Sequence, residues 1–487
     1  MMKASSYPCG QFEGNTDVGE GARPGSCSYD EARERYVVDG AGANIWDNRD
    51  DFHFVWKRMS GDFIVTARAA FEGEGANAHR KLGWMARASL DPDAPHVSAV
   101  VHGDGLLALQ FRRSRGGETE EVRSPLTDAD VVRLERRGTT WIVSTARSGE
   151  PFTTVQVDGV DPGEDTHVGL FVCSHEEDTR ERAVFDNVRV VVPVGDGFDR
   201  AHDPFGSRLE LLDVGSGDRR VLARADYVLE APNWTRDGKA LIYNSGGRLY
   251  RFDLASSEAS PIDTGDVVDT NNDHVISFDG STLAVSSHSR EDGGSVVYTV
   301  PLTGGRARRV TPNAPSYLHG WSPDGRFLVY TGARNGEFDV YRISVDGGEE
   351  ERLTTAPGLD DGPEYTPDGE YIYFNSVRSG LMQIWRMKPD GSGQEQLTDD
   401  EYNNWFPHVS PDGRWIAFVS YLADEVDPGD HPPAKRVYLR LMPRDGGEPR
   451  VIAYVYGGQG TMNVPSWSPD GTQLAFVSNT VPFGGGA

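Results

Sequence analysis

A five-residue turn motif recurs through the second half of the chain and constrains the fold more than any other feature. The motif is Trp321-Ser322-Pro323-Asp324-Gly325, and it returns almost unchanged as Trp467-Ser468-Pro469-Asp470-Gly471. Four looser copies have their aspartates at positions 237, 279, 368 and 412, so successive aspartates are separated by 42, 45, 44, 44 and 58 residues. A repeat of this period, with short strands on each side, is typical of a β-propeller.

Strands left over at the two ends of the repeat region indicate how many blades it forms. Each full repeat has one strand before the Asp-Gly turn and others after it, as at 326–330 and 339–343. The last copy is followed only by the strand pattern at 473–478, whereas two such patterns, 209–214 and 220–223, precede the first copy. If these strands from the two ends share one blade, no free strand edge remains where the ring closes. We therefore predict a six-bladed propeller over residues 207–487, with its last blade closed by strands from the N-terminal end of the domain.

The first half of the chain has a different pattern, in which short alternating strands are separated by turn signals. About ten such strands between residues 31 and 194 predict a β-sandwich of jelly-roll type. Residues 1–30 are polar and are predicted to form a lead-in, and the glycine-rich residues 195–206 are predicted to form a linker. The whole chain is therefore predicted to be all-β, because no stretch keeps a helical period for long.

Two segments near the end of the predicted sandwich carry a family resemblance. They are Gly169-Leu170-Phe171-Val172-Cys173-Ser174-His175 and Val184-Phe185-Asp186-Asn187-Val188-Arg189-Val190. These segments resemble the closing strands of concanavalin A-like lectin/glucanase sandwiches. The resemblance implies carbohydrate binding as the commonest role of such a domain, and catalysis less often.

Trp46 is the tryptophan of the sandwich that best suits an exposed platform for a sugar ring. It lies in the polar loop at 44–48, and an indole face suits the apolar face of a pyranose. A core position for Trp46 is the alternative. The acidic residues at 47–51 are either a Ca²⁺ site or a solvated turn. Trp84 and Trp141 have apolar neighbours on their strands, so we predict that both are core residues.

The repeat region carries a second resemblance. The motifs that carry it are the Trp-Ser-Pro-Asp-Gly turns, the segment at 373–380 and Ile384-Trp385-Arg386-Met387. With these WD40-like repeats the region resembles the six-bladed TolB-like propellers. Relatives with that fold include a periplasmic protein-binding component, peptidase propeller domains and a uronate lyase. The resemblance therefore implies the fold strongly and the function weakly.

Composition argues against several kinds of partner. The formal net charge is −27 and the isoelectric point is near 4.8, so the surface would repel nucleic acid and anionic lipid. No 18-residue apolar stretch and no signal-peptide pattern is present, so we expect no membrane insertion and a cytoplasmic location.

Cysteine usage and missing motifs limit the cofactors. The chain has Cys9, Cys27 and Cys173, an odd number whose spacing suits no zinc site, so we expect no disulfide framework. It has no Walker loop, no dinucleotide fingerprint and no Gly-x-Ser-x-Gly elbow. We therefore expect no nucleotide and no organic cofactor.

Residues that enter the first strand of each blade are predicted to ring the central channel. Aligned on the Asp-Gly turn, they include His274, His319, Glu364 and His408. Converging imidazoles suit Mn²⁺, Fe²⁺ or Zn²⁺, so a divalent metal site is one prediction. Separate hydrogen-bonding roles for the histidines are the alternative. In the uronate lyase relatives, histidines and a glutamine hold manganese, and the resemblance implies by position that Gln459 matches that glutamine.

Polar loops on the same face supply further candidates. Those predicted to bind a ligand are Asn272, Asp361, Asn404 and Asn463. Arg378 lies in the loop on this face and would either clamp the carboxylate of an acidic sugar or brace its loop.

The long 58-residue step places an insertion on this face of the propeller at residues 423–436. An insertion in such a position is expected to act as a lid or a specificity loop. It carries His431 and Lys435, which together with Glu364 and Asp361 are the candidate acid/base groups.

We predict a carbohydrate-active or carbohydrate-binding protein with a saccharide in the central funnel of the propeller. A metal-assisted lyase or hydrolase is one version. The alternative is a non-catalytic recognition or scaffold protein that binds a protein or glycan partner on the same face. The distances between the rings of His274, His319 and His408 test whether a metal is bound. Ligation of one ion requires ring nitrogens roughly 3–3.5 Å apart.

Overall fold

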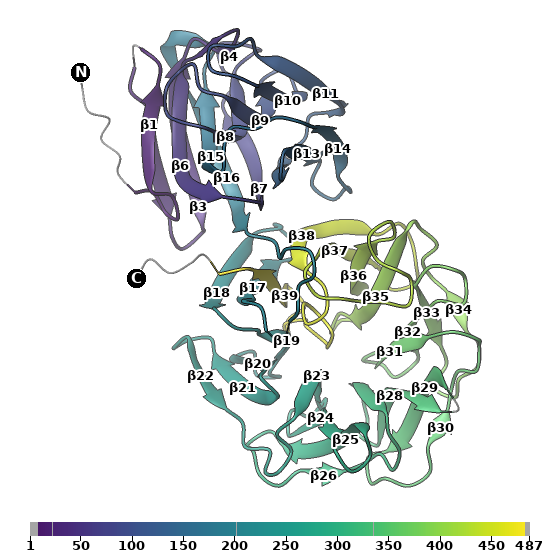
Figure 1. The fold of residues 1–487 in the computed structure, drawn as a ribbon. Coiled ribbons are helices and arrows are strands. Elements are labelled where there is room, and N and C mark those ends of the chain that lie inside the picture. Colours follow the sequence, from purple (N-terminus) through teal and green to yellow (C-terminus); the bar gives the residue numbers. More distant parts are fainter. Residues whose placement is uncertain (1–7, 22, 201, 335, 483–487) are drawn as a thin grey trace. The chain divides into compact units, whose positions relative to one another are not determined.

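The computed structural model describes residues 8–482 with the exception of 22, 201 and 335. Its described residues form strands and no α-helix, so none of them forms a helix that could cross a membrane. The chain divides into two compact units, Met1–Pro193 and Val194–Ala487. The prediction of an all-β chain is confirmed (Figure 1).

The N-terminal unit consists of two seven-stranded antiparallel sheets. The first sheet contains, in spatial order, β1 (Gly14–Val18), β6 (Phe52–Ser60), β15 (Asp165–Cys173), β8 (Lys81–Arg87), β9 (His96–His102), β10 (Leu106–Arg112) and β11 (Glu120–Thr127). The second contains β14 (Thr153–Val157), β13 (Thr140–Ala146), β12 (Val131–Arg137), β7 (Phe63–Glu72), β16 (Glu176–Val191), β3 (Arg35–Gly42) and β2 (Ser26–Asp30). A small separate hairpin is formed by β4 (Ile45–Trp46) and β5 (Arg49–Asp50).

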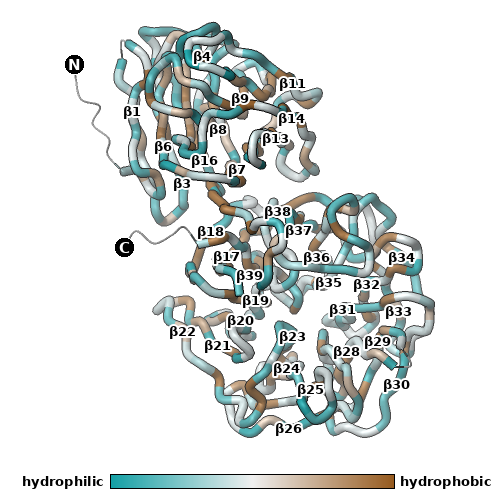
Figure 2. The backbone as a smooth tube through the Cα atoms, viewed as in Figure 1, coloured by the Kyte–Doolittle hydropathy of each residue, from teal (hydrophilic) through white to brown (hydrophobic). Residues whose placement is uncertain are grey.

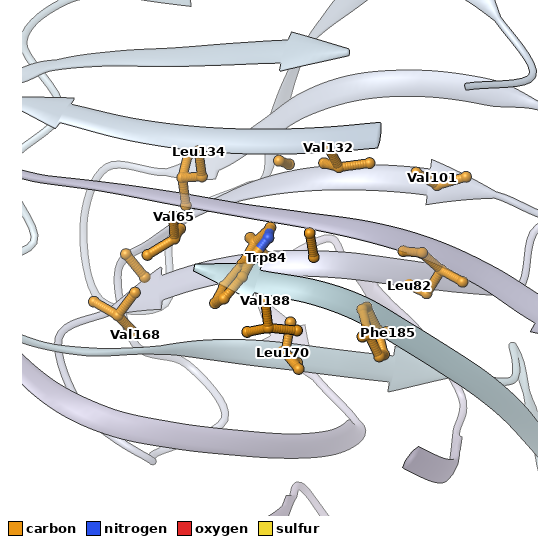
Figure 3. Packing of buried hydrophobic residues seen from close by; sticks show 14 of the residues in the cluster. Val65, Leu82, Trp84, Val101, Val132, Leu134, Val168, Leu170, Phe185 and Val188 are labelled. Carbon is orange, nitrogen blue, oxygen red and sulfur yellow. The ribbon is translucent and has the colours of Figure 1, made fainter. Parts of the chain in front are cut away.

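The core of the N-terminal unit contains side chains from both sheets. Alternation along β8 turns Leu82 and Trp84 to the same face, where they join one cluster with Val65 of β7 and Leu134 of β12 (Figure 3). All four side chains are fully buried, and so is Trp141. Complete burial of one large apolar side chain contributes about 1.5–3 kcal/mol. Trp84 and Trp141 are therefore core residues, as the sequence predicts.

Part of the predicted lead-in, residues 1–30, is folded. β1 pairs with β6 and β2 pairs with β3, and a disulfide joins Cys9 to Cys27 while Cys173 is buried and free. The sequence predicts no disulfide framework and misses this one bond, because an odd count does not tell which thiols the fold brings together. β2 lacks an apolar signal because its side chains are exposed or half-buried. Residues 1–7 lie outside the described residues.

The C-terminal unit has six sheets arranged as the blades of a propeller (Figure 1), so the predicted blade count is confirmed. Blade 1 contains β19 (Glu230–Trp234), β20 (Ala240–Ser245), β21 (Arg248–Asp253) and β22 (Glu258–Pro261). Blade 2 contains β23 (Thr270–Ile276), β24 (Thr282–Ser289), β25 (Gly294–Pro301) and β26 (Arg308–Arg309). Blade 3 contains β27 (Ser316–Trp321), β28 (Phe327–Arg334), β29 (Glu337–Ser344) and β30 (Glu351–Arg352).

The remaining blades complete the ring. Blade 4 contains β31 (Asp360–Tyr365), β32 (Ile372–Ser376), β33 (Gln383–Met387) and β34 (Glu395–Gln396). Blade 5 contains β35 (Tyr402–Val409), β36 (Trp415–Leu422), β37 (Lys435–Pro443) and β38 (Arg450–Gly457). In blade 6, β17 (Gly206–Asp213) pairs with both β18 (Arg219–Ala225) and β39 (Gln473–Thr480). Figure 2 shows hydrophobic colour concentrated on strands and hydrophilic colour on most connecting loops.

The tryptophans of the recurring motif join neighbouring blades. Trp321 Nε1 donates a hydrogen bond to the Val275 carbonyl of the preceding blade at 2.9 Å. Trp467 Nε1 makes the equivalent bond to the His408 carbonyl at 2.9 Å. In the turn itself, the Ser322 hydroxyl donates to Asp324 at 2.6 Å. The motif is therefore a structural device that closes each turn and ties the blades together.

Candidate functional site

The first strands of blades 4 and 5 are irregular where their side chains reach the centre of the propeller. The register of β31 shifts immediately before Glu364, and that of β35 shifts immediately before His408. Each shift contains a left-handed residue, Gly362 with φ of +61° and Phe406 with φ of +57°. A bulge re-aims the side chains that follow it, and a left-handed phenylalanine costs of order 1–3 kcal/mol. No turn residue marks the Phe406 bulge, so the sequence does not predict it.

Glu364 and His408 form a buried pair at the centre of the propeller. His408 Nδ1 lies 2.7 Å from Glu364 Oε2, and His408 Nε2 lies 3.0 Å from the Met462 carbonyl. The other carboxylate oxygen, Oε1, accepts from the Val409 backbone N–H at 3.0 Å. Both ring nitrogens and both carboxylate oxygens therefore have partners. These contacts do not support the predicted acid/base role of Glu364 or the predicted metal-ligand role of His408.

His319 and Asp361 form a second buried pair between blades 3 and 4. His319 Nε2 lies 3.1 Å from Asp361 Oδ1, which also accepts from Thr331 Oγ1 at 2.6 Å. His431 Nε2, from the insertion, lies 4.0 Å from Asp361 Oδ2. Burial favours the neutral acid, but the bond and charge of His319 outweigh it and lower the pKa of Asp361 to about 2. Burial also opposes protonation of His319, yet its bond to Asp361 raises its pKa.

Asp273 adds a second carboxylate to this group. Its exposed fraction is 5%, and it accepts one hydrogen bond from the Asn271 amide at 2.9 Å. Burial raises the pKa of Asp273 to about 7, an effect that His319 opposes and the Asp361 charge strengthens. The side-chain amide nitrogen of Asn272, the residue before Asp273, is among the buried atoms of the described residues that have no hydrogen-bond partner. We call Asp273, His319, Asp361 and His431 the axial polar group.

The predicted divalent metal site does not fit the side chains. His274 is fully buried and its Nε2 donates to the Ile242 carbonyl at 3.2 Å, and burial lowers its pKa to about 4. The Gln459 carbonyl oxygen accepts from the Asn463 amide at 3.0 Å. In the part of the chain that the structure describes, no three His, Cys, Asp or Glu side chains form a group that could hold a metal ion. The residues therefore fit the alternative of separate hydrogen-bonding roles.

Two predicted ligand-binding residues have structural contacts instead. Arg378 donates to Asp360 Oδ2 at 2.6 Å and to Ser376 Oγ at 2.8 Å, so its guanidinium braces the loop. The Asn404 side chain is fully buried, donates to Asp400 at 3.0 Å and accepts from Ser420 at 2.7 Å. The contacts of Arg378 match its alternative role as a loop brace, and those of Asn404 join neighbouring segments of blades 4 and 5.

The insertion brings one of its two candidate residues to the site. The His431 ring packs edge-on against Trp405 with centroids 4.4 Å apart, and lies 5.4 Å from the Phe406 ring. Lys435 begins β37 and makes no side-chain hydrogen bond or ion pair with any described residue. His431 therefore joins the axial polar group, and Lys435 has no contact that assigns it a role there.

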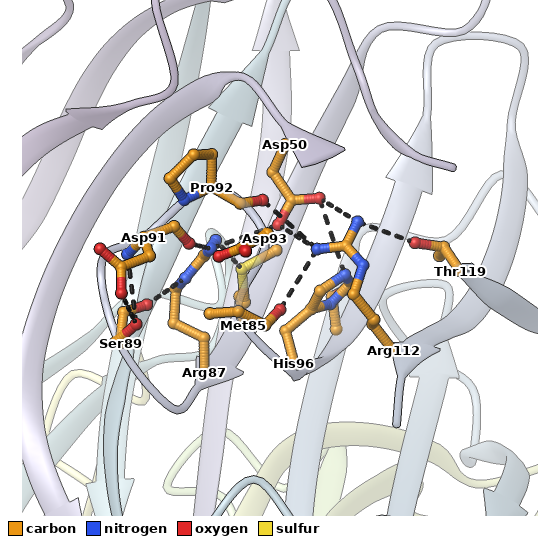
Figure 4. A network of polar contacts seen from close by, with 12 residues as sticks. Asp50, Met85, Arg87, Ser89, Asp91, Pro92, Asp93, His96, Arg112 and Thr119 are labelled. Carbon is orange, nitrogen blue, oxygen red and sulfur yellow. Dashed lines mark hydrogen bonds and ion pairs between the residues drawn. The ribbon is translucent and has the colours of Figure 1, made fainter. Parts of the chain in front are cut away.

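The acidic loop of the N-terminal unit is held by arginines (Figure 4). Asp50 is fully buried, and its two oxygens accept from Arg112 at 2.7 and 2.9 Å. The second arginine, Arg87, lies 3.3 Å from Asp50 Oδ2. A carboxylate committed to two guanidinium groups does not suit the predicted Ca²⁺ site. Trp46, on the same hairpin, is half-buried, and the Lys81 ammonium lies 5.6 Å from its ring centroid.

Two hollows lie on the other face, where the Asp-Gly turns are. A cavity of about 150 Å³ at the centre is lined by residues of all six blades, including Asn233, Glu364 and Trp467. A groove of about 450 Å³ between blades 2 and 3 shares Phe278 and Trp321 with it. None of the side chains that the sequence predicts to bind a ligand or a metal lines the groove between blades 2 and 3.

Replacing Asp273 by asparagine will change how stability depends on pH. The pKa of Asp273 is about 7 in the folded chain, above its ordinary value of 3.8, so the folded state holds a proton that the unfolded state releases. The contribution of Asp273 to wild-type stability should fall from about pH 4 to pH 7, by at most about 1.4 kcal/mol per pH unit. Urea unfolding across this range should show the variant gaining stability relative to wild type as pH rises. Equal pH profiles would contradict the prediction.

Comparison with known proteins identifies relatives of the propeller. The family profile described as PD40, TolB beta propeller domain, matches residues 312–428. An uncharacterized protein of Agrobacterium fabrum (strain C58) is 49% identical over 273 residues, which are 56% of this chain and 92% of the relative. A solved structure described as "putative TolB" from Agrobacterium tumefaciens is 48% identical with a TM-score of 0.55, and the match covers 57% of this chain and 99% of that one.

A more distant solved structure is oligogalacturonate lyase in complex with manganese. It is 14% identical with a TM-score of 0.37, and the match covers 57% of this chain and 98% of that one. A likeness at this level carries no argument about a metal or a substrate.

Proposed function

The chain belongs to the TolB-like β-propeller family, and we propose that its propeller is a binding module for a hydroxyl-rich ligand, a saccharide, at the axial polar group. The proposal rests on the burial of Asp273 and on its raised pKa. Asp273 is a buried carboxylate whose raised pKa makes the folded state less stable at neutral pH. A side chain that reduces stability, such as a buried carboxylate, is expected mainly at a functional site.

Hydroxyl groups match the hydrogen-bonding capacity that this part of the channel leaves unused. Asp273 accepts one hydrogen bond, from the Asn271 amide, whereas the side-chain amide nitrogen of Asn272 has no acceptor. A hydroxyl group donates and accepts at once, so a polyol satisfies both. A buried polar atom without a partner costs about 1–3 kcal/mol, and a ligand that pairs it recovers that free energy.

A specific arrangement favours a second candidate function, metal-independent proton transfer on the bound saccharide. Asp361 Oδ1 lies 3.1 Å from His319 Nε2 and orients the buried imidazole ring. A carboxylate that orients an imidazole is a recurrent arrangement for general acid–base catalysis. The metal-assisted lyase or hydrolase is not supported, because the residues predicted to bind the ion have other partners.

The proposal is tested by calorimetric titration of the full chain with a panel of neutral and acidic oligosaccharides. We expect at least one to bind, and Asp273→Asn to weaken that binding by tenfold or more, equivalent to about 1.4 kcal/mol. The substitution keeps the shape of the side chain and the bond from Asn271, so folding should be unaffected at pH 5. Asp390→Asn, at an exposed turn, is the matched control and should bind as wild type does.

Other outcomes separate the alternatives. Product formation that is lost in His319→Gln while binding stays within a few-fold would favour the catalytic candidate. No binding across the panel, or equal binding by wild type and Asp273→Asn, would overturn the saccharide proposal. The protein or glycan scaffold alternative would then be favoured by a defined protein partner whose binding is sensitive to the insertion at 423–436.

The cytoplasmic location remains a prediction. The disulfide between Cys9 and Cys27 is more typical of proteins in oxidising compartments, where such bonds persist.

A further inference from the structure

Blades 3 and 4 carry the same stack of three side chains on the Asp-Gly face. In blade 3 the Arg342 guanidinium lies 4.8 Å from the Phe327 ring centroid and donates to Glu351 at 3.0 Å. Its Nη1 also reaches the Pro389 carbonyl of the next blade at 2.9 Å. Blade 4 repeats the arrangement with Tyr371, Arg386, Glu395 and the next blade's Asp445. In both blades the arginine therefore fills the space between neighbours.

Blade 2 replaces all three members of this stack. By strand register, Thr282, Thr299 and Arg308 stand where blade 3 has its aromatic residue, its arginine and its glutamate. Two short side chains thus take the place of two long ones, and the space between blades 2 and 3 stays open as the groove of about 450 Å³. The charge at the third position is also inverted, because Arg308 stands where blades 3 and 4 have a carboxylate.

The groove combines apolar walls with two guanidinium groups. Its apolar lining consists of Phe278, Val300, Pro301, Trp321, Pro323 and Val345. Arg306 and Arg308 line it as well, and both are exposed. Arg308 donates to the Val345 carbonyl at 2.8 Å, and within the described ranges neither arginine has a carboxylate partner. Both are therefore available to an anionic ligand.

The acidic residues of the groove limit the charge of that ligand. Asp279 and Asp324 line it and accept bonds within their own turns, from Ser277 Oγ and Ser322 Oγ, each at 2.6 Å. These carboxylates would repel a polyanion such as a nucleotide or an acidic peptide run. A single carboxylate can meet the arginines, while an apolar body fills the rest of the groove.

We propose that the groove between blades 2 and 3 is a second binding site, and that it takes a ligand with one carboxylate on an apolar body. A free organic acid and the C-terminal residue of a peptide share this chemistry. The site is independent of the axial polar group, since it lies on the Asp-Gly face and uses other residues. Its success or failure is therefore separable from the saccharide proposal.

Calorimetric titration of the full chain tests the site with three probes. They are 3-phenylpropionate, the peptide N-acetyl-Gly-Gly-Phe with a free carboxylate, and the same peptide as its C-terminal amide. We expect one or both carboxylates to bind and the amide to bind at least tenfold more weakly. Tighter binding of phenylpropionate identifies a free acid as the source, and tighter binding of the peptide acid identifies a chain terminus. No binding up to about 10 mM, or equal binding of acid and amide, overturns the proposal.

Variants assign the binding to the groove. Arg306→Gln/Arg308→Gln should weaken carboxylate binding tenfold or more, whereas Arg414→Gln, an exposed turn arginine of blade 5 paired with Asp412, should not change it. Thr282→Phe/Thr299→Arg/Arg308→Glu rebuilds the stack of blades 3 and 4 and should abolish binding while the chain stays folded. Undiminished binding in both groove variants would overturn the site, even if the probes bind elsewhere.

Discussion

Replacing Asp50 by alanine will lower the free energy of unfolding of the N-terminal unit by about 3–5 kcal/mol, the range expected when one partner of a buried ion pair is removed. Asp50, Arg87 and Arg112 are all fully buried. Burial lowers the pKa of Arg87 to about 10, and the charge of Asp50 opposes that shift. Without Asp50, two guanidinium groups would stay in the interior with only carbonyl, hydroxyl and thioether partners, among them the Ser89 and Pro92 carbonyls (Figure 4).

Urea unfolding of the full chain, resolved by hydrogen exchange of peptides from each unit, measures this effect. Asp93→Ala is the matched control, because Asp93 pairs with Arg115 nearby but both side chains are solvent-accessible, 39% and 58%. The control should cost less than about 1 kcal/mol. Asp50→Asn, which keeps the shape and one acceptor, should fall between the two. If Asp50→Ala costs no more than the control, the two arginines do not depend on the carboxylate.

The importance of Asp50 could not be predicted from sequence. It lies among acidic and polar neighbours, which is the pattern of a solvated turn, and its partner Arg112 is 62 positions away. Alternation along a strand distinguishes two faces but does not tell which loop covers the outer one. The same limit explains the missed disulfide, since Cys27 lies on a strand of exposed and half-buried side chains and Cys9 lies before the first strand.

The propeller was predictable because its determinants are local. Each Asp-Gly turn is closed by contacts within five residues, such as Ser322 to Asp324, so a short motif is sufficient to count blades. The directions of the channel side chains are not local. Alignment places His408 and His319 at nearby positions of their strands, but the bulge at Phe406 and the partners Glu364 and Asp361 decide where each ring points.

The groove between blades 2 and 3 did leave a signal in the sequence. Thr299 stands where the next two repeats have Arg342 and Arg386, but the spacing from the Asp-Gly turn differs in blade 2, so only the strand register aligns these positions. The difference lies in the outer strands of the repeats and not in the polar loops. It is the absence of long side chains, and not the presence of polar ones, that makes this groove.

Replacing Glu364 by alanine will destabilise the propeller by about 3 kcal/mol. The substitution removes the acceptor of His408 Nδ1 and of the Val409 backbone N–H, and each buried donor left unpaired costs about 1–3 kcal/mol. The exposed fractions of Glu364 and His408 are only 7% and 3%. Water from the central cavity of about 150 Å³, which Glu364 lines, can reach the vacated space, so the loss should lie below that of Asp50→Ala.

A double-mutant cycle with Glu364→Ala and His408→Ala isolates the interaction of the pair. We expect a coupling free energy above about 1.5 kcal/mol, because the bond joins a carboxylate to an imidazole out of water. Glu351→Ala, whose side chain is 50% exposed, is the control and should change stability by less than about 1 kcal/mol. A coupling near zero would mean that solvent already screens the pair.

The Glu364 variant also separates stability from function at the axial polar group. Glu364 was a candidate acid/base residue by its position, yet its two oxygens hold His408 and Val409 rather than point at unpaired groups. If the saccharide site lies at Asp273 and His319, Glu364→Ala should retain ligand affinity within a few-fold at temperatures where the propeller is folded. Asp273→Asn should instead lose ligand affinity, and it should be more stable than wild type above pH 7. Such opposite effects on stability and on binding would assign Glu364 to the fold and Asp273 to the ligand site.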